Sequence, residues 1–348
     1  MKFPNKTFRV AICGAAIVSI PGAAQAATFS SATVFATGTS VGGTQPDSVT
    51  YGNGSVWIEY GNGASSTGGS GSSTIVQYNT AGAVQNSYSI AGSVDGLKYN
   101  PYTGMVWALQ NQDGGSQLTI LNPMTKAMTA FSYGAPYPSV SGTRGFDDVA
   151  FIGNSVYLSF TNPASTTHAV LVKLNSATPS SPIGFSTVLT GAGVLLTDSD
   201  SLKSTTAGNL VQTGGADGAL TFINNPGTAS QTATSLKLAA PGATIGSPDD
   251  SIYPTASSGT FYLTDTATNT VYSLFATGLS TSSLYVNVGN EFGRVDLTTG
   301  VVTPILSGSS LHGLEFVASS SAVPEPTSVG MSLCGIALAL LARKRFAS

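Results

Sequence analysis

Between residues 27 and 322, β-branched and aromatic residues alternate with polar ones, and no segment keeps a helical period beyond two turns. Alternation with a period of two is typical of strands that bury one face. Asn53-Gly54, a favoured two-residue hairpin turn, separates the first two such runs. The first block predicts four short antiparallel strands, at 47–51, 55–60, 74–78 and 85–90.

The blocks share an opening pattern: an acidic residue, a small or acidic residue, and an aliphatic residue. It occurs at Asp47-Ser48-Val49, Asp95-Gly96-Leu97, Asp147-Asp148-Val149, Asp200-Ser201-Leu202 and Asp250-Ser251-Ile252, with His312-Gly313-Leu314 as a variant. The first five openings are spaced by 48, 52, 53 and 50 residues. This near-constant spacing indicates one repeated supersecondary unit.

Later units follow the same plan. The second unit predicts strands at 97–100, 105–109, 117–121 and 127–131. The first hairpins of the next three units are expected at Gly153-Asn154, Gly208-Asn209 and Ser258-Gly259. Before His312, the runs 283–288, 293–297 and 301–306 match the second, third and fourth strands of the first unit. They therefore indicate a further unit.

Four-stranded units of about 50 residues predict an all-β fold, a β-propeller of four-stranded blades. Six blades are expected, with five or seven as alternatives. A large β-sandwich or a β-helix is the alternative architecture. Residues 28–37 form a lone strand at the start. We expect it to pair with strands near the chain end and to close the ring, which removes exposed sheet edges.

The first 26 residues have the three parts of a secretory signal peptide. Lys2, Lys6 and Arg9 precede an apolar run over 10–24, and Ala24-Gln25-Ala26 forms an A-x-A cleavage site. A permanent N-terminal membrane anchor is the alternative, but the run is too short to span about 30 Å of hydrocarbon.

The last 26 residues also have three parts. Val323 leads into Pro324-Glu325-Pro326, an apolar stretch over 328–342 follows, and Arg343-Lys344-Arg345 ends it. This tail resembles the PEP-CTERM sorting signal of Gram-negative bacteria. The resemblance implies recognition by a membrane exosortase and delivery to the cell surface or the extracellular polysaccharide matrix. A permanent tail anchor is the alternative and has the same topology, because the basic cluster stays cytoplasmic.

The chain therefore divides into a signal peptide (1–26), a propeller body (27–322) and a sorting or anchor segment (323–348). Cys13 and Cys334 both fall in the end segments, so the body cannot form a disulfide. Only 8% of all residues are charged, against about 25% in average soluble proteins. The body has seven Lys and Arg and 15 Asp and Glu, a net charge of −8. This charge argues against nucleic acid as a partner.

The repeated acidic residues are the candidate metal ligands. The first strand of a propeller blade lines the central channel, so one mouth is expected to gather Asp47, Asp95, Asp147, Asp200, Asp250 and His312. Oxygen atoms converging from several blades could bind Ca²⁺, which takes 6–8 oxygen ligands. The alternative is structural, because an Asp just before a strand can cap its own turn.

The strand opening and the Thr299-Gly300 type of turn resemble the NHL/SMP-30/lactonase-like propeller group. The resemblance implies a site in the channel, with His312 beside Asp250 or Asp47 as a general acid or base. A polar turn residue is the alternative interpretation of His312. Trp57 and Trp107 are expected in the core between blades, and His168 on an outer strand or its loop.

Two functions follow. The first is an exported, surface-sorted binding or structural protein that contacts an extracellular ligand such as polysaccharide. The second is a lactonase-like hydrolase that uses a channel metal and His312 as general base. Convergence of the repeated Asp side chains on one point would favour the second, and separate capping of each turn would favour the first.

Overall fold

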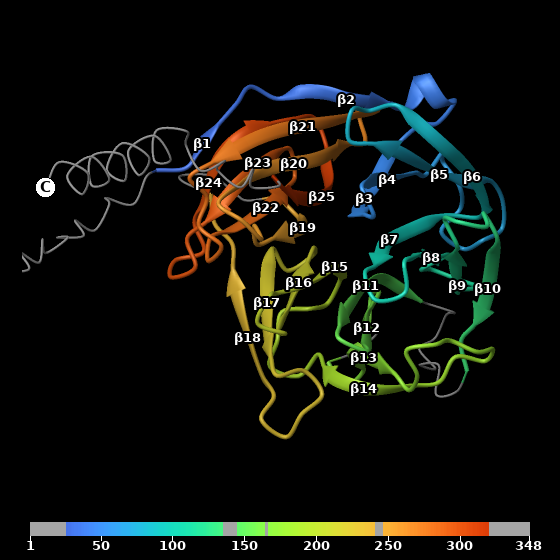
Figure 1. The fold of residues 1–348 in the computed structure, drawn as a ribbon. Helices are drawn as coiled ribbons and strands as arrows, with labels where there is room; N and C mark the ends of the chain where they lie inside the picture. The colour runs from blue at the N-terminus through green and yellow to red at the C-terminus, as the bar shows by residue number, and fades with distance from the viewer. Residues whose placement is uncertain (1–25, 135–144, 164–165, 241–245, 320–348) are drawn as a thin grey trace, which may run out of the picture.

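The structure is a computed structural model that describes residues 26–134, 145–163, 166–240, 246–319. Apart from one 3-10 turn, η1 (Gly38–Val41), every regular element in these ranges is a strand. The strands form six sheets arranged as blades around a central channel (Figure 1). The predicted six-bladed propeller of four-stranded blades is confirmed.

Blades 1 to 4 each use four consecutive strands. Blade 1 holds β3 (Pro46–Gly52), β4 (Ser55–Tyr60), β5 (Ser72–Asn79) and β6 (Val84–Ala91). Blade 2 holds β7 (Val94–Asn100), β8 (Met105–Gln110), β9 (Gln117–Leu121) and β10 (Met128–Ser132). Blade 3 holds β11 (Phe146–Ile152), β12 (Ser155–Phe160), β13 (Ala169–Leu174) and β14 (Phe185–Thr190). Blade 4 holds β15 (Ser199–Ser204), β16 (Leu210–Gly214), β17 (Ala219–Asn224) and β18 (Thr232–Lys237).

The hairpin signal in blade 1 acts as predicted. Gly52 pairs with Ser55, so Asn53 and Gly54 form a two-residue turn. Both turn residues have positive φ, 50° and 72°, which suits Asn and Gly. The inner strand then lies against the channel, and the fourth strand lies at the outer rim.

Blades 5 and 6 exchange strands. Blade 5 combines β19 (Pro248–Ile252) with β22 (Leu284–Val288), β23 (Glu291–Val295) and β24 (Val302–Ser307). Blade 6 combines β25 (Leu311–Ala318) with β20 (Ser258–Asp265), β21 (Thr270–Thr277), β1 (Thr28–Phe29) and β2 (Thr33–Thr37). The chain thus leaves blade 5 after its inner strand, builds two strands of blade 6, and returns.

This exchange corrects the predicted hairpin at Ser258-Gly259. Gly259 lies inside β20, between Ala276 of β21 and Ala318 of β25. A Cβ there would lie 2.4 Å from a ring carbon of Phe316. The glycine therefore allows close packing of strands rather than a turn. The three runs before His312 do serve as second, third and fourth strands, and their inner strand is β19.

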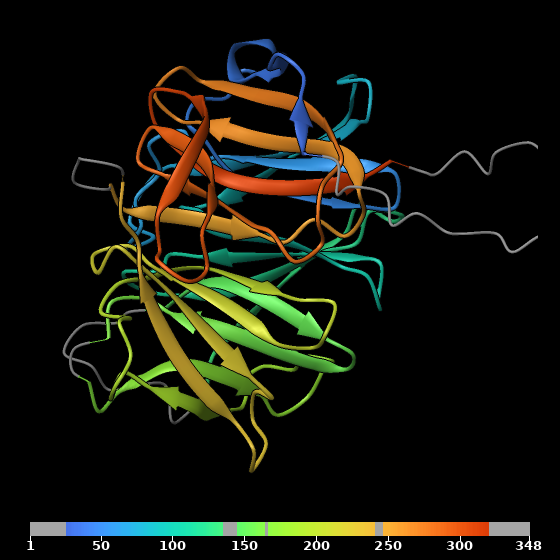
Figure 2. The ribbon, with the colours of Figure 1, turned by 90° about the vertical axis from the view of Figure 1, so that its left-hand side faces the viewer.

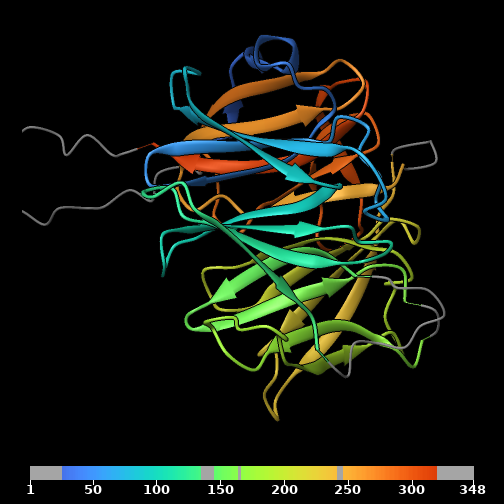
Figure 3. The same cartoon turned by 90° about the vertical axis from the view of Figure 1, so that its right-hand side faces the viewer.

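Ring closure follows the expectation. β1 and β2 pair with β21, in the blade whose innermost strand is the C-terminal β25. Both ends of the body thus belong to one sheet, which joins the first and last parts of the chain by backbone hydrogen bonds. Figures 2 and 3 show the described ends on the same side of the disc.

The core lies between neighbouring blades. Trp57 of blade 1 packs with Leu97 of blade 2, and Trp107 of blade 2 packs with Phe151 of blade 3. Both tryptophans are 1% exposed, which confirms their predicted place. Because the inter-blade layers fill this way, the channel wall is fixed on all sides.

Both predicted end segments, with the sorting motif and nearly all of the signal sequence, lie outside the described residues. Within the described ranges, no helix has the length and apolar character needed to cross a bilayer.

Candidate functional site

The inner strand of each blade contains a β-bulge at one mouth of the channel. In blade 1, Pro46 pairs with Tyr60 and Val49 with Ile58, so Asp47 and Ser48 together face a single residue of β4. The other inner strands show register shifts in the same place. We call the first residue of each of these six bulges, taken together, the mouth ring: Asp47, Asp95, Asp147, Asp200, Asp249 and His312.

The register changes the fifth member of the predicted ring. Pro248 pairs with Val288 and Ser251 with Val286, which places Asp249, not Asp250, at the position of Asp47. The sequence pattern was misleading because Ser251 fills the position that is aliphatic in other blades. Asp250 lies one residue further into the channel.

Side chains of the second strand hold the ring backbone in place. The hydroxyl of Ser159 donates to the carbonyl of Asp200 at 3.0 Å. The hydroxyl of Thr213 donates to the backbone carbonyl of Asp249 at 2.9 Å. The hydroxyl of Thr264 donates to the backbone carbonyl of Asp47 at 2.6 Å. In blades 3, 4 and 6, a hydroxyl of the second strand thus positions the ring residue of the next blade.

The mouth ring surrounds a cavity of about 300 Å³. Nine of its lining residues are aspartates: Asp47, Asp95, Asp113, Asp147, Asp148, Asp198, Asp200, Asp249 and Asp250. The basic residues in the lining are Lys98, Lys203 and His312. Acidic groups therefore dominate the charge of this cavity.

The ring carboxylates converge. Burial raises the pKa of Asp95 well above its usual value, and the charges of Asp47 and Asp249 raise it further. Burial and the neighbours Asp95 and Asp200 likewise raise the pKa of Asp147. Burial and the charge of Asp249 also raise the pKa of Asp200. Carboxylates from different blades are thus close enough to repel one another.

These carboxylates do not cap their own turns. Among the hydrogen bonds of the described residues, no backbone N–H donates to a mouth-ring carboxylate, whereas Gln112 donates to Asp95 at 3.3 Å. Oδ2 of Asp147 is enclosed and has no hydrogen-bond partner in the described structure. The mouth-ring carboxylates therefore converge on one cavity and do not each cap their own turn.

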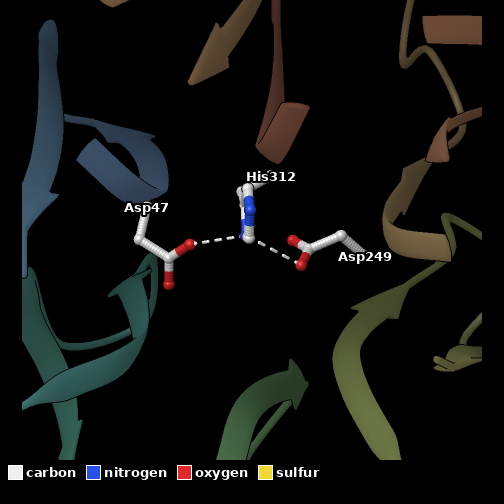
Figure 4. Close-up of side chains that lie close together, drawn as sticks. All are labelled: Asp47, Asp249 and His312. Carbon is white, nitrogen blue, oxygen red and sulfur yellow. Dashed lines mark ion pairs between the residues drawn. The ribbon is translucent and has the colours of Figure 1, made fainter. Parts of the chain in front are cut away.

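His312 is the one cationic member of the ring. Its Nδ1 lies 3.0 Å from an oxygen of Asp47 and 3.0 Å from an oxygen of Asp249 (Figure 4). Its Nε2 is 3.0 Å from the hydroxyl of Ser310. Burial lowers the pKa of His312, but the hydrogen bonds and charges of Asp249 and Asp47 outweigh burial and raise it to about 11. At neutral pH, His312 is therefore an imidazolium.

One group of donor atoms meets the spacing of a metal site. Oxygens of Asp47 and Asp249 and a nitrogen of His312 lie within 4.8 Å of one another. The other mouth-ring residues add further carboxylates around the same cavity. The donor set is rich in hard oxygen, which suits Ca²⁺ or Mg²⁺ better than a soft metal.

A second charged layer lies below the ring. Asp148 is 3.2 Å from the ammonium of Lys98, and Asp250 is 2.8 Å from that of Lys203. Asp148 also accepts a hydrogen bond from the backbone N–H of Leu202 at 2.9 Å. Asp250 accepts the equivalent bond from Leu314 at 2.8 Å. These two aspartates connect neighbouring inner strands.

Sequence reasoning missed Asp249 and this second layer. The signal for the second layer was present: Lys98 and Lys203 each stand three residues after the ring position of their unit, as Glu315 does after His312. His168 lies in the loop before β13, as expected, and is half-buried.

No protein-family model and no curated protein matches the chain. Solved structures do. A protein provisionally assigned as a gluconolactonase matches with a TM-score of 0.51 at 10% identity, over 83% of this chain and 89% of its own. The periplasmic gluconolactonase of Pseudomonas aeruginosa gives 0.48 at 12%, over 78% and 88%. Virginiamycin B lyase from Staphylococcus aureus gives 0.47 at 12%, over 84% and 94%. At such identities the likeness concerns the fold alone.

Proposed function

We propose that the protein is an exported, surface-displayed propeller whose acidic mouth binds a divalent cation, Ca²⁺ first, and through it an extracellular ligand. The observation that supports this is the convergence of five carboxylates, each from a different blade, on one cavity. Export and display rest on the two end segments of the sequence.

The donor groups fit a cation. The ring carboxylates repel one another, and among the described lining residues His312 is the positive charge at their level. Oδ2 of Asp147 is enclosed and accepts no hydrogen bond from the described residues, so a cation could take it as a ligand. Asp47 and Asp249, whose oxygens have the spacing of a metal site, would hold the cation together with Asp95, Asp147 and Asp200, which line the same cavity. The cation would supply the positive charge that offsets the repulsion between these carboxylates.

The cation would also provide the link to a ligand. Ca²⁺ takes 6–8 oxygens and accepts hydroxyl, carbonyl and carboxylate groups, so positions facing the open mouth can take oxygens from outside the protein. A polysaccharide offers many such oxygens. Its presence around the cell agrees with the similarity of the tail to a PEP-CTERM sorting signal, which an exosortase-type enzyme would process.

Hydrolysis is the second candidate, and the convergence of Asp47, Asp249 and His312 favours it. A general base must be unprotonated, whereas the two carboxylates hold His312 as an imidazolium in this arrangement. His312 therefore serves the ring better as a positive charge. Its role as a base stays a prediction: lactone or ester hydrolysis by the purified protein, lost in His312→Gln, would establish it.

A calcium-titrated thermal melt tests the proposed cation site. At a Ca²⁺ concentration about 100 times the Kd, binding stabilises the native state by about 2.7 kcal/mol, or roughly 4 °C in Tm for a chain of this size. The shift should reverse with chelator and be absent in Asp95→Asn/Asp147→Asn. Asp296→Asn, which removes one carboxylate away from the mouth, is the control. An unchanged Tm in the native protein at millimolar Ca²⁺ would refute the site.

A further inference from the structure

Strand direction sorts the loops of the propeller into two faces. Every inner strand begins at the mouth ring, so the turns after the first and third strands of each blade lie at the opposite end of the channel. Gly52 pairs with Ser55, and Tyr78 with Val84, at this end of blade 1. We call it the lower face, and it includes residues 53–54, 79–83, 101–104, 122–127, 153–154, 175–184, 205–209, 225–231, 253–257, 278–283 and 296–301.

Exposed apolar side chains gather on the lower face. Among the described large hydrophobic residues with high exposure, five lie in its turns or at the adjoining strand ends: Val84, Tyr102, Met124, Met128 and Leu297. Met124 is 85% exposed. On the side of the mouth ring, Leu195 alone belongs to this group, at 37%. These side chains belong to blades 1, 2 and 5, so the lower face carries more exposed apolar side chains than the mouth side does.

The two faces also differ in charge. The mouth-ring side carries the aspartate-lined cavity. On the lower face, the charged residues of the described turns and outer strand ends are Lys126, Lys173, Arg294 and Asp296. An anionic lipid surface would therefore attract the lower face and repel the mouth.

Both described chain ends leave from the lower face. Thr28 pairs with Thr277 at the lower end of blade 6, and the N–H of Ser319 donates to the carbonyl of Ser258 beside it. Figures 2 and 3 show this common exit side. Residues 320–327 separate the body from the apolar run of the tail, and eight residues reach at most about 29 Å.

That reach restricts how the body can face a membrane. β25, with eight residues, spans about 26 Å between the two faces. A tether that is hardly longer cannot pass around the edge of a blade and also bring the mouth to the bilayer. If the tail is anchored, the lower face stays near the lipid.

We infer that the lower face is a membrane-facing surface, with the partner an anionic lipid bilayer, and that the acidic mouth points away from it. The inference rests on the proposed surface display, with the C-terminal segment retained as the tail anchor that is the alternative to sorting. Met124, Leu297 and Tyr102 reach the headgroup layer, where exposed apolar and tyrosine side chains are favourable. The mouth stays open to the medium, as a site for an extracellular ligand requires.

Quenching by spin-labelled lipid tests the orientation. The body contains no cysteine, so the full chain with Cys13→Ser and Cys334→Ser accepts a single label. Met124→Cys places a fluorophore on the lower face, and Leu195→Cys places a matched one on the mouth side. Each protein is reconstituted into phosphatidylethanolamine and phosphatidylglycerol vesicles that contain headgroup nitroxides. We expect several-fold stronger quenching at position 124 than at 195, unchanged when protein is diluted in lipid.

Other outcomes overturn the inference in distinguishable ways. Protein that does not float with the vesicles has no anchor, and the proposed attachment fails together with the inference. Protein that floats but is quenched equally at both positions, or more at 195, overturns the orientation alone. Shielding of position 124 that disappears on dilution means that a second copy, not lipid, covers the face.

Discussion

Two adjacent aspartates of β11 have different environments. Asp147 joins the mouth ring, where burial and neighbouring carboxylates raise its pKa. Asp148 is paired: it accepts hydrogen bonds from the N–H groups of Val149 and Leu202 and lies 3.2 Å from the ammonium of Lys98. The first carboxylate is available for a ligand, and the second stabilises the blades.

The difference predicts opposite effects on stability. With chelator present, Asp147→Asn should raise the free energy of unfolding by about 1 kcal/mol, because it removes one of several repelling charges. Asp148→Asn should lower it by about 3 kcal/mol, because Lys98 loses its buried partner. Urea unfolding of both variants measures this. A loss of stability in Asp147→Asn would mean that the residue is structural.

Glu59 adds a second residue-scale prediction. Its side chain is fully buried, and burial, with the charge of Asp47, raises its pKa well above 4.5. The native state keeps a proton that the unfolded state loses, so stability falls as pH rises above 4.5. Glu59→Gln should remove this dependence and gain up to about 3 kcal/mol at pH 7. If the free energy of unfolding changes with pH equally in the variant and the native protein between pH 4.5 and 7, the prediction is wrong.

At the scale of the elements, the exchange between blades 5 and 6 gives Gly259 its importance. Gly54 is a turn glycine with φ of 72° and open space around its Cβ position. A Cβ at Gly259 would instead overlap the ring of Phe316 and the carbonyl of Val317. The two glycines therefore meet different physical demands.

Alanine substitution separates these demands. Gly54→Ala should cost about 1 kcal/mol, for backbone strain alone. Gly259→Ala should cost about 3 kcal/mol, because backbone and a packed ring must move. Chemical denaturation of both variants provides the comparison. Equal costs would indicate that Gly259 is in a turn and that β19 and β20 form a local hairpin.

Local signals explain what could be predicted from the sequence. The four-strand unit, the Asn53-Gly54 turn and the inter-blade tryptophans depend on short-range patterns. The pairing of β19 with β22 depends on residues far apart in the chain, and the bulge that selects Asp249 over Asp250 is a matter of register. Alternation of polar and apolar residues does not determine either.

At the scale of the whole molecule, the propeller has two unlike faces. One collects aspartates from all of the first five inner strands, and the other carries exposed apolar side chains and both described chain ends. This division suits the proposed display role, which needs attachment on one side and an open site on the other. Cation binding at the mouth is the central part of the proposed function.

Calorimetric titration with Ca²⁺ tests that claim most directly. The purified protein should bind one ion per chain with a Kd of about 10⁻⁴ M, in the range of extracellular calcium modules. Asp95→Asn/Asp147→Asn should weaken binding at least tenfold, and Asp296→Asn should leave it unchanged. No binding heat at millimolar Ca²⁺, together with no competition against a calcium indicator dye, or equal affinity in all three proteins, would contradict the account.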